Sequence, residues 1–405
     1  MSYNLIILFA TPVFILLIFT EFIYGLIKQK NNYRLNDTFM SINLGILSRI
    51  PEILNLGFAT LIYEITANHF SLGIIWENNI YLWVIAFIFY DFLYYWLHRA
   101  SHRINILWAA HSVHHHGEEF NLATALRQTS TGFLSKWIFF IPSFIVGFPS
   151  EVFFAVGALN LIYQFWVHTE HIGKLGFLEY ILVTPSNHRI HHAINDEYID
   201  ANYGGVFIIW DRLFGSFVEE DADKVIIYGT KSPLRSWNPF WANFQVYNHI
   251  YKSFFTANNL KEIFNFLFKP PEWSSNRLNQ KNIIFTEKYE TLISNDLRLT
   301  ILVLFSLTLS SSAILSIFIG QINQIELIIC LAFIINSIYF ISKISECKAL
   351  QVKYEFIKLA SFLLLFIFIF DKQHLVQLTV IIHSIISLIF IHFISHKSFR
   401  YLKDR

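Results

Sequence analysis

Long apolar runs are the feature that most constrains what this chain can fold into. Leu5–Ile27 and Ile80–Leu97 are two of them. A helix of about 20 apolar residues crosses the ~30 Å hydrocarbon core of a bilayer. Only 15% of the residues are charged and 54% are hydrophobic, whereas a soluble domain carries about 25% charged residues. The sequence therefore predicts an integral, multi-pass membrane protein of the all-α class.

Seven further apolar runs are candidate spans. They are Phe39–Ile65, Phe133–Phe148, Val152–Val167, Leu299–Ile319, Ile325–Ile341, Phe356–Phe370 and Leu375–Ile394. The run at Phe39–Ile65 contains Arg49 and Pro51, so it predicts either one kinked span or a re-entrant pair. The runs on either side of Pro149 and Ser150 predict a hairpin.

The basic residues predict which ends of the spans face the cytoplasm, because Lys and Arg in short loops favour that side. The basic segments are 28–34, 98–132, 168–298, 343–355 and 395–405. The connections 67–79, 149–151 and 320–324 contain no Lys or Arg. An even number of spans between successive basic segments places every basic segment on one face. We expect the amino terminus outside and the carboxyl-terminal tail inside, in a bacterial inner membrane or an endoplasmic reticulum.

The histidines carry the functional signal. Residues 98–192 hold 11 of the 17 histidines of the chain. His98 and His102 form an HxxxH pattern, and two HxxHH patterns follow. Those are His111, His114 and His115, extended by His116, and then His188, His191 and His192; His168 and His171 add an i, i+3 pair. On a helix such spacings place side chains about 5–6 Å apart on one face.

Neutral imidazole is the commonest side-chain metal ligand, so these patterns predict a metal site. One ion is satisfied by three or four ligands, and eight or nine convergent histidines therefore indicate two ions. Zn, Cu, Fe and Ni all accept imidazole, which leaves the metal open at this point. The HExxH signature of zinc proteases is absent. The isolated histidines are expected to be surface residues: His69, His249, His374, His383, His392 and His396.

Two functional classes are excluded and one is disfavoured. A net charge of +1 excludes the strongly basic face of a nucleic-acid-binding protein. Cys330 and Cys347 are too few for a disulfide scaffold or a four-cysteine zinc site. A histidine-rich metal transporter or sensor is a remote alternative, because it would place ionisable residues inside the spans. Here the histidine patterns lie at span ends.

Four segments resemble the fatty acid hydroxylase/sterol desaturase superfamily of membrane-bound di-iron enzymes. They read YDFLYYWLHRASH (90–102), LWAAHSVHHHGEEFNLATALRQT (107–129), YQFWVHTE (163–170) and TPSNHRIHHAINDEYIDANYGGVFIIWDRLFGSF (184–217). The portions EEFNLATALRQT and YQFWVHTE, together with the extra carboxyl-terminal spans, are most similar to the branch that oxidises alkylglycerols. Arg103 departs from the animal members of that branch, which have an acidic residue at this position.

The resemblance implies two iron ions at the cytoplasmic ends of the spans. It makes these residues the ligands: His98, His102, His111, His114, His115, His168, His188, His191 and His192. His116 and His171 are expected to support the site or lie on the surface. Dioxygen is the implied co-substrate. No GxGxxG fingerprint, CxxC pair or haem domain is found, so a separate donor must supply electrons, either tetrahydrobiopterin or a cytochrome or ferredoxin system.

Four other residues are candidate catalytic groups. Asp91 lies two helical turns before His98, and we expect it to face the metals and accept a hydrogen bond from a ligand histidine or from Arg99. Glu118 and Asn121, together with Glu119, follow the second histidine pattern and could serve the same purpose; the alternative is a solvated loop. Tyr203 is implied only by the resemblance, as a residue on the pterin or substrate side.

The resemblance also implies a division of the chain and a reaction. We expect amino-terminal spans (1–79), a di-iron catalytic domain (80–218), a cytoplasmic or interfacial segment (219–298) and carboxyl-terminal spans with a tail (299–405). The implied reaction is hydroxylation of a membrane lipid at the ether-linked carbon of an alkylglycerol. The alternative is hydroxylation or desaturation of a sterol, a fatty-acyl chain or a carotenoid.

Overall fold

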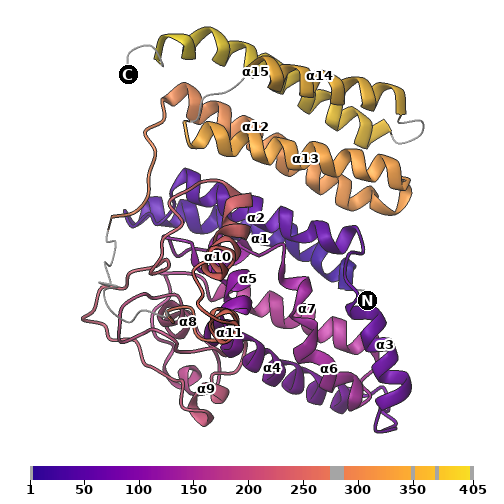
Figure 1. Cartoon of the computed structure of the whole chain (residues 1–405), viewed down its shortest axis with the longest axis vertical. Helices are drawn as coiled ribbons and strands as arrows, with labels where there is room; N and C mark the ends of the chain where they lie inside the picture. Colours follow the sequence, from indigo (N-terminus) through magenta and orange to yellow (C-terminus); the bar gives the residue numbers. More distant parts are fainter. Residues whose placement is uncertain (1–2, 274–286, 348–351, 370–373, 402–405) are drawn as a thin grey trace. The chain divides into compact units, whose positions relative to one another are not determined.

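The chain is all-helical where the structure describes it. The computed structural model describes residues 3–273, 287–347, 352–369 and 374–401, and these contain helices and two isolated β-bridges but no strand. The all-α prediction is confirmed. The chain divides into two compact units, one of residues 1–235 and 241–288, the other of residues 236–240 and 289–405 (Figure 1).

The first unit contains the helices that surround the histidines. They are α1 (Tyr3–Ile27), α2 (Leu35–Ile53), α3 (Ala59–Phe70), α4 (Ile80–Arg103), α5 (Asn105–His115), α6 (Trp137–Ile145), α7 (Ser150–Trp166), α8 (Pro185–His191), α9 (Ile209–Leu213), most of α10 (Pro239–Phe254) and α11 (Leu260–Phe268). The second unit contains α12 (Asn295–Phe318), α13 (Gln324–Ser345), α14 (Val352–Ile369) and α15 (His374–Tyr401).

Five helices are long and apolar enough to cross a membrane, which confirms a multi-pass membrane protein. They contain Phe9–Ile27, Ile80–Arg103, Asn295–Gln321, Gln324–Ser345 and Leu375–Phe393. The predicted run Phe39–Ile65 is two helices, α2 and α3, rather than one kinked span. The hairpin around Pro149 is present, but α6 has only nine residues. That is about 14 Å of helix, too short for the span predicted at Phe133–Phe148.

Helix α4 is the central element of the first unit. Asn79 begins it by accepting hydrogen bonds from the backbone N–H groups of Tyr81 and Leu82. It packs against α5, α6 and α7. Its apolar face joins Leu93 and Leu97 to a core whose other buried members are Tyr63, Phe140, Phe144 and Phe153. The helix ends at Arg103, and α5 begins almost at once at Asn105, so the last turns of α4 lie beside the histidine-bearing helix.

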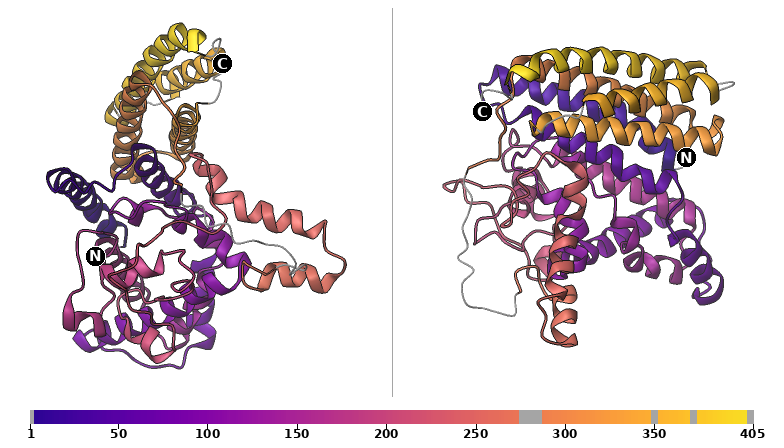
Figure 2. Two further views of the ribbon diagram at one scale, coloured as in Figure 1. Left: turned by 90° about the vertical axis from the view of Figure 1, so that its left-hand side faces the viewer. Right: turned by 45° about the horizontal axis from the view of Figure 1, so that its top comes forward.

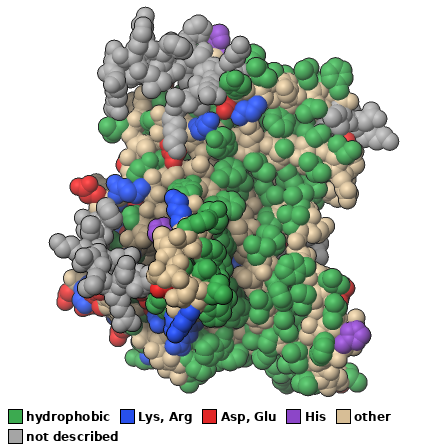
Figure 3. All heavy atoms as spheres, in the orientation of Figure 1, with side chains coloured by type: hydrophobic (Ala, Val, Ile, Leu, Met, Phe, Trp, Pro, Cys, Tyr) green, Lys and Arg blue, Asp and Glu red, His purple; other side chains and the backbone are tan. Residues whose placement is uncertain are grey.

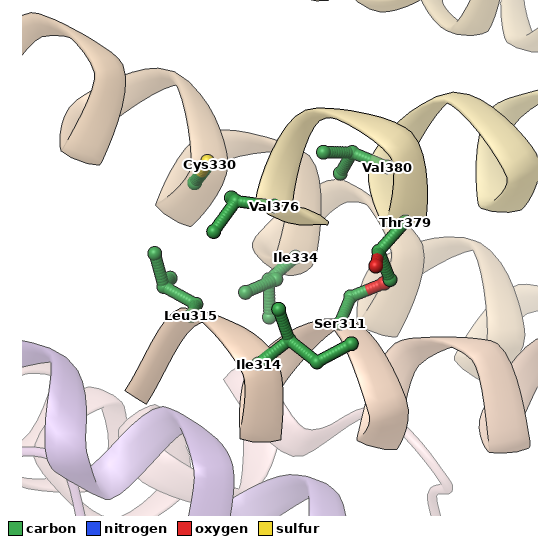
Figure 4. A pocket seen from close by; sticks show the side chains of 8 residues that line it. All are labelled: Ser311, Ile314, Leu315, Cys330, Ile334, Val376, Thr379 and Val380. Carbon is green, nitrogen blue, oxygen red and sulfur yellow. The ribbon is translucent and has the colours of Figure 1, made fainter. Parts of the chain in front are cut away.

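The second unit is a bundle of four helices in which α12 contacts α13 and α15, and α14 contacts α15. Asn323 and Glu326 form a reciprocal capping box at the start of α13, and Ser294 caps α12. Inside the bundle is a small, mostly apolar cavity between α12, α13 and α15 (Figure 4).

Near this cavity, His383 is 1% exposed and its Nδ1 lies 3.0 Å from the hydroxyl of Ser311. The expectation that His383 lies on the surface is therefore wrong. Phe370 of the predicted span Phe356–Phe370 and the side chains of His374 and His396 lie outside the described residues.

Candidate metal centre

Nine histidines converge in two groups. The five-histidine group consists of His98, His102, His111, His115 and His191. The four-histidine group consists of His114, His168, His188 and His192. Within each group, one ring nitrogen per residue can be chosen so that all lie within 4.8 Å of one another. The groups are neighbours, because the rings of His115 and His192 stack with centroids 4.4 Å apart. The structure thus brings together all nine histidines that the sequence singled out.

Each HxxHH pattern is divided between the two groups in the same way. In α5, His111 and His115 are four residues apart and join one group, while His114 joins the other. In α8 the roles are reversed: the i, i+4 pair, His188 and His192, belongs to the four-histidine group and His191 to the five-histidine group. Successive helical residues point about 100° apart, so neighbours such as His114 and His115 necessarily face different sides. The pattern therefore serves two adjacent centres.

Four of the histidines are oriented by backbone carbonyls. The Nδ1 atoms of His98, His114, His168 and His191 lie 2.8, 2.9, 2.8 and 3.0 Å from the carbonyl oxygens of Tyr203, Arg127, Gln164 and Ala201. A carbonyl oxygen only accepts, so Nδ1 carries the proton and donates. The other nitrogen, Nε2, then keeps its lone pair, which is the arrangement a histidine needs to bind a metal.

These lone pairs fit bound cations. The Nε2 atoms of His114 and His168 lie 3.2 Å apart, and since both rings carry their proton on Nδ1, two lone pairs face each other. That contact is repulsive unless a cation lies between them. The Nε2 atoms of His102 and His191 are buried with no hydrogen-bond partner. Buried polar atoms are normally satisfied, so their isolation also indicates a missing ligand.

The spacing of the nitrogens agrees with shared ions. Neighbouring Nε2 atoms lie 3.0 Å apart for His98 and His111, 3.1 Å for His111 and His115, and 3.0 Å for His168 and His188. Two donors at right angles on an ion with metal–nitrogen bonds of about 2.1 Å would be ~3.0 Å apart. The residues present therefore fit two transition-metal ions held by imidazole.

Burial keeps the histidines in the neutral, ligand form. For those outside α4, removal from water is the largest cause that lowers the pKa, followed in most by the charges of neighbouring groups. The residues affected are His111, His114, His115, His168, His188, His191 and His192. The pKa of His114 falls to about 4. A histidine that is neutral at pH 7 does not have to lose a proton before it binds a metal.

The same shifts predict that the metal-free protein loses stability in mild acid. A histidine with a pKa near 6.5 in the unfolded chain and about 4 in the folded one binds more protons when unfolded, so stability falls as the pH drops below 6.5. For His114 alone we expect the free energy of unfolding to fall by about 2–3 kcal/mol by pH 4.5. Denaturant unfolding of metal-free protein at pH 7.5 and 4.5 measures this. Equal stability at both pH values would contradict it.

Asp91 is buried, but its partners are not those expected. Its Oδ1 accepts from Nδ2 of Asn160 (2.7 Å) and the backbone N–H of Val206 (2.8 Å). Its Oδ2 accepts from the backbone N–H of Phe207 and from Nε1 of Trp210, both at 3.0 Å. The predicted bond to a ligand histidine or Arg99 was wrong, because four other donors use both oxygens.

The contacts of Asp91 join α4 to the 203–210 segment. The approach is close: a Cβ on Gly205 would lie 2.7 Å from Oδ1 of Asp91. In that segment the backbone N–H groups of Tyr203 and Gly204 both donate to the carboxylate of Asp211 at 2.7 Å. Asp91 and Asp211 therefore hold the turn whose Tyr203 carbonyl orients His98.

Glu118 and Asn121 lie near the histidines without joining either group. Glu118 pairs with Arg34 (Oε2 to Nη2, 3.1 Å). Glu119, 6% exposed, pairs with both Arg34 (2.6 Å) and Lys288 (2.7 Å). Asn121 is buried, donates to the carbonyl of Asn32 and accepts from the backbone N–H groups of the turn that follows. This loop is held by ion pairs and hydrogen bonds instead of being solvated.

Tyr203 lies beside the five-histidine group. Its ring is 2% exposed, and its centroid is 5.2 Å from that of His102 and 6.0 Å from that of His191. His102 also has an acidic neighbour, since its Nδ1 lies 3.7 Å from Oδ1 of Asp200, which pairs with Arg103. The Arg103 side chain thus serves to hold the carboxylate next to a histidine of the group.

His116 and His171 belong to neither group. His116 ends α5 and is buried, and its Nδ1 has no hydrogen-bond partner. Burial lowers its pKa to about 3. His171 packs edge-on against the ring of Tyr24, with centroids 5.1 Å apart. Both positions agree with the expectation that they lie outside the set of nine.

Two supporting residues were not predicted. Arg127 is 1% exposed, and its guanidinium bonds the carbonyl of Val113 and pairs with Asp37 at 3.2 Å, while its own carbonyl orients His114. Glu21 of α1 accepts hydrogen bonds from the hydroxyls of Thr169 and Tyr33 and from the backbone N–H of Leu122. A carboxylate inside the apolar run Leu5–Ile27 was the signal that could have revealed Glu21.

Comparison with known proteins gives consistent matches. A family model described as fatty acid hydroxylase matches residues 83–216. The chain is 34% identical to the alkylglycerol monooxygenase of Homo sapiens over 369 residues, covering 89% of this chain and 82% of that protein. It is 41% identical to the Danio rerio alkylglycerol monooxygenase over 268 residues, covering 65% of this chain and 59% of that protein. It is 30% identical to the ornithine lipid hydroxylase OlsE of Rhizobium tropici over 135 residues, or 33% of this chain and 41% of that protein. No solved structure matches the chain.

Proposed function

The chain belongs to the fatty acid hydroxylase family, and from this premise we propose that it is a membrane-bound, non-haem di-iron monooxygenase that hydroxylates a lipid. The observation that supports this most directly is the pair of adjacent histidine groups with unpaired, converging nitrogens. The domain expected at 80–218 contains all nine of these histidines. Matches to relatives that act on lipids, and helices suited to a bilayer, agree with a lipid substrate.

The nine histidines would hold one iron ion in each group. Iron bound there would supply the redox chemistry that reduces dioxygen with two external electrons, inserting one oxygen atom into a C–H bond and releasing the other as water. The chain itself fixes the ligands: the carbonyls of Tyr203, Arg127, Gln164 and Ala201 hold four rings in the metal-binding tautomer. Burial of the rings excludes bulk water, which would otherwise compete for the ions.

For the substrate we propose the ether-linked carbon of an alkylglycerol. Among the matches described above, those to alkylglycerol monooxygenases continue well beyond residues 83–216, whereas the match to the ornithine lipid hydroxylase covers only 135 residues. Hydroxylation consumes one O2, two electrons and two protons and yields water and a hemiacetal. The hemiacetal then collapses to an aldehyde and glycerol without further oxidation. Sterol, fatty-acyl or carotenoid hydroxylation is the alternative.

The two electrons would come from a separate donor, which for the ether-lipid reaction we propose to be tetrahydrobiopterin. A cytochrome or ferredoxin system is the alternative that accompanies the other lipid substrates. We also propose that the centre faces the cytoplasm, because the basic segment 28–34 follows the end of α1 and the basic segment 98–132 begins at the histidine-bearing end of α4. Tyr203, whose ring lies beside that of His102, is proposed to lie on the side of the site that the substrate occupies.

The experiment that tests this proposal compares electron donors in one purified preparation. We expect iron-loaded enzyme to consume an alkylglycerol with oxygen and tetrahydrobiopterin and to release a fatty aldehyde. Parallel reactions contain a ferredoxin or cytochrome donor, and a sterol or a fatty-acyl lipid replaces the alkylglycerol in the control set. Turnover only of the control lipids, or only with the protein donors, would contradict the ether-lipid assignment.

A further inference from the structure

We propose that the outward faces of α10 and α11 form a docking surface that lies in the headgroup region of the bilayer. The proposed occupant of this surface is the lipid leaflet of the membrane in which the spans of the same chain lie. This interfacial docking surface is defined by its exposed apolar residues: Leu260, Phe264 and Phe268 on α11, and Phe244, Tyr251 and Phe255 on and just after α10.

Helix α11 presents a continuous apolar stripe to the outside. Leu260, Phe264 and Phe268 are spaced four residues apart, so they lie along one face of the helix. They are 82%, 60% and 46% exposed. The rings of Phe264 and Phe268 contact each other, with centroids 4.5 Å apart. Contact of apolar side chains with water is unfavourable in proportion to their exposed area, so this stripe is unfavourable in water.

Helix α10 continues this apolar surface. Phe244, Tyr251 and Phe255 are 55%, 59% and 74% exposed. At three- and four-residue multiples along the helix they share one side of it. Exposed lysines border both helices at Lys252, Lys261 and Lys269. Phe, Tyr and Lys together on short amphipathic helices are typical of segments that lie in a membrane interface, with the ammonium groups near anionic headgroups.

The direction of the hairpin fits this position. In Figure 1 α4 and α7 run across the view while α10 and α11 are seen nearly end-on, and the left view of Figure 2 shows α10 and α11 lengthwise as a projecting hairpin. A hairpin that runs across α4 lies along the plane of a bilayer that α4 crosses. Figure 3 shows hydrophobic side chains over the region of these helices, bordered by Lys and Arg.

Hydrogen bonds attach α11 to the start of α5 and α10 to the 129–131 segment. The backbone N–H of Asn105, at the start of α5, donates to the carbonyl of Lys269 (3.1 Å), and its Nδ2 donates to the carbonyl of Phe266 (2.9 Å). On α10, Asn243 accepts from the backbone N–H of Ser130 (2.8 Å), and Tyr247 donates to the hydroxyl of Thr131 (3.0 Å). Docking on the leaflet would therefore hold α5, which carries three of the nine histidines, at the membrane surface.

A spin label placed in the stripe tests this surface. Proteins with one accessible cysteine are made in the full chain with Cys347→Ser, since the other native cysteine, Cys330, is 2% exposed and is left in place. Phe264→Cys reports on the docking surface. Val84→Cys, 48% exposed on the span α4, is the bilayer reference, and Asp223→Cys, on an exposed loop, is the water reference. Each is reconstituted in nanodiscs that hold one copy and contain anionic lipid.

The readout is the collision rate of each label with oxygen, which concentrates in lipid, and with a water-soluble nickel chelate. We expect the Phe264 label to prefer oxygen severalfold more than the Asp223 label does, approaching the Val84 label. A Phe264 label that behaves like the Asp223 label overturns the proposal. A label shielded from both reagents also overturns it, because protein would then cover the stripe. Because single-copy discs hold no second copy and no soluble partner, such a protein cover would be another part of the same chain.

A charge variant separates the role of the lysines from that of the aromatic residues. Lys252, Lys261 and Lys269 are changed together to Gln in the Phe264→Cys protein. We expect the oxygen preference of the label to decrease in anionic nanodiscs and to stay the same in zwitterionic ones. The parent and the variant are compared in both kinds of nanodisc. If each shows the same oxygen preference in anionic as in zwitterionic lipid, the assignment of these lysines to anionic headgroups is overturned.

Discussion

Replacing one histidine from each group, His191→Ala or His114→Ala, is expected to abolish turnover and to lower bound iron. His191 belongs to the five-histidine group and His114 to the four-histidine group, so each variant removes one donor from a different proposed ion. Loss of a residue that merely orients a ligand costs about 10–100-fold in metal affinity or activity, and loss of a ligand should cost more. Iron per protein and the initial rate with lipid, oxygen and donor measure the effect.

The control for these variants is His249→Ala. His249 is exposed on α10 and belongs to neither group, so its loss should leave iron content and rate unchanged. His116→Ala provides a second comparison, because His116 is buried next to His115 but lies outside both groups. Wild-type iron and activity in His191→Ala or in His114→Ala would contradict the assignment of that residue as a ligand.

The change Asp91→Asn is expected to lower the free energy of unfolding by about 3–5 kcal/mol. The carboxylate accepts four hydrogen bonds, two on each oxygen. An asparagine has one accepting oxygen, and its NH2 group would face two donors that then have no acceptor. Because Asp91 holds the segment whose Tyr203 carbonyl orients His98, iron content should decrease as well. Thermal unfolding in detergent and metal analysis measure both effects.

Glu151→Gln is the matched control for Asp91→Asn. Glu151 is an exposed carboxylate in the first turn of α7, so the same chemical change there should alter stability by less than about 0.5 kcal/mol. If Asp91→Asn has the same free energy of unfolding as the wild type, the four hydrogen bonds contribute little. The inference that Asp91 holds the 203–210 segment is then wrong. If it loses stability but keeps all of its iron, the segment does not position His98 as inferred.

Most of what could be predicted about the fold and the candidate site came from the apolar runs and the histidine spacings. Helical periodicity alone places His111 and His115 on one face, and it could have separated them from His114. The length of a run does not specify how much of it is helical, which is why α6 is shorter than the run at Phe133–Phe148. Helix α6 begins only after Lys136 and ends at Ile145, two residues before Gly147, whose φ of 86° is not helical.

Long-range partners could not be predicted from spacing. Asp91 was expected to accept a hydrogen bond from a ligand histidine or from Arg99, but its donors come from residues 160 and 206–210. Arg127 and Asp37 are 90 positions apart and form a fully buried ion pair, and neither stands in a recognisable local pattern. Such contacts depend on how α2, α4, α5 and α7 pack, and no periodicity along one segment records this packing.

The division of the histidines has a consequence for synthesis of the protein. Each group needs residues from α8: the five-histidine group needs His191, and the four-histidine group needs His188 and His192. A ribosome-bound chain that has inserted α4 and made α5 holds only four rings of one set and a single ring of the other. The five-histidine group is complete only at residue 191 and the four-histidine group only at residue 192. Incorporation of metal is therefore tied to production of the whole catalytic segment, and a fragment that ends before these residues gains no complete site.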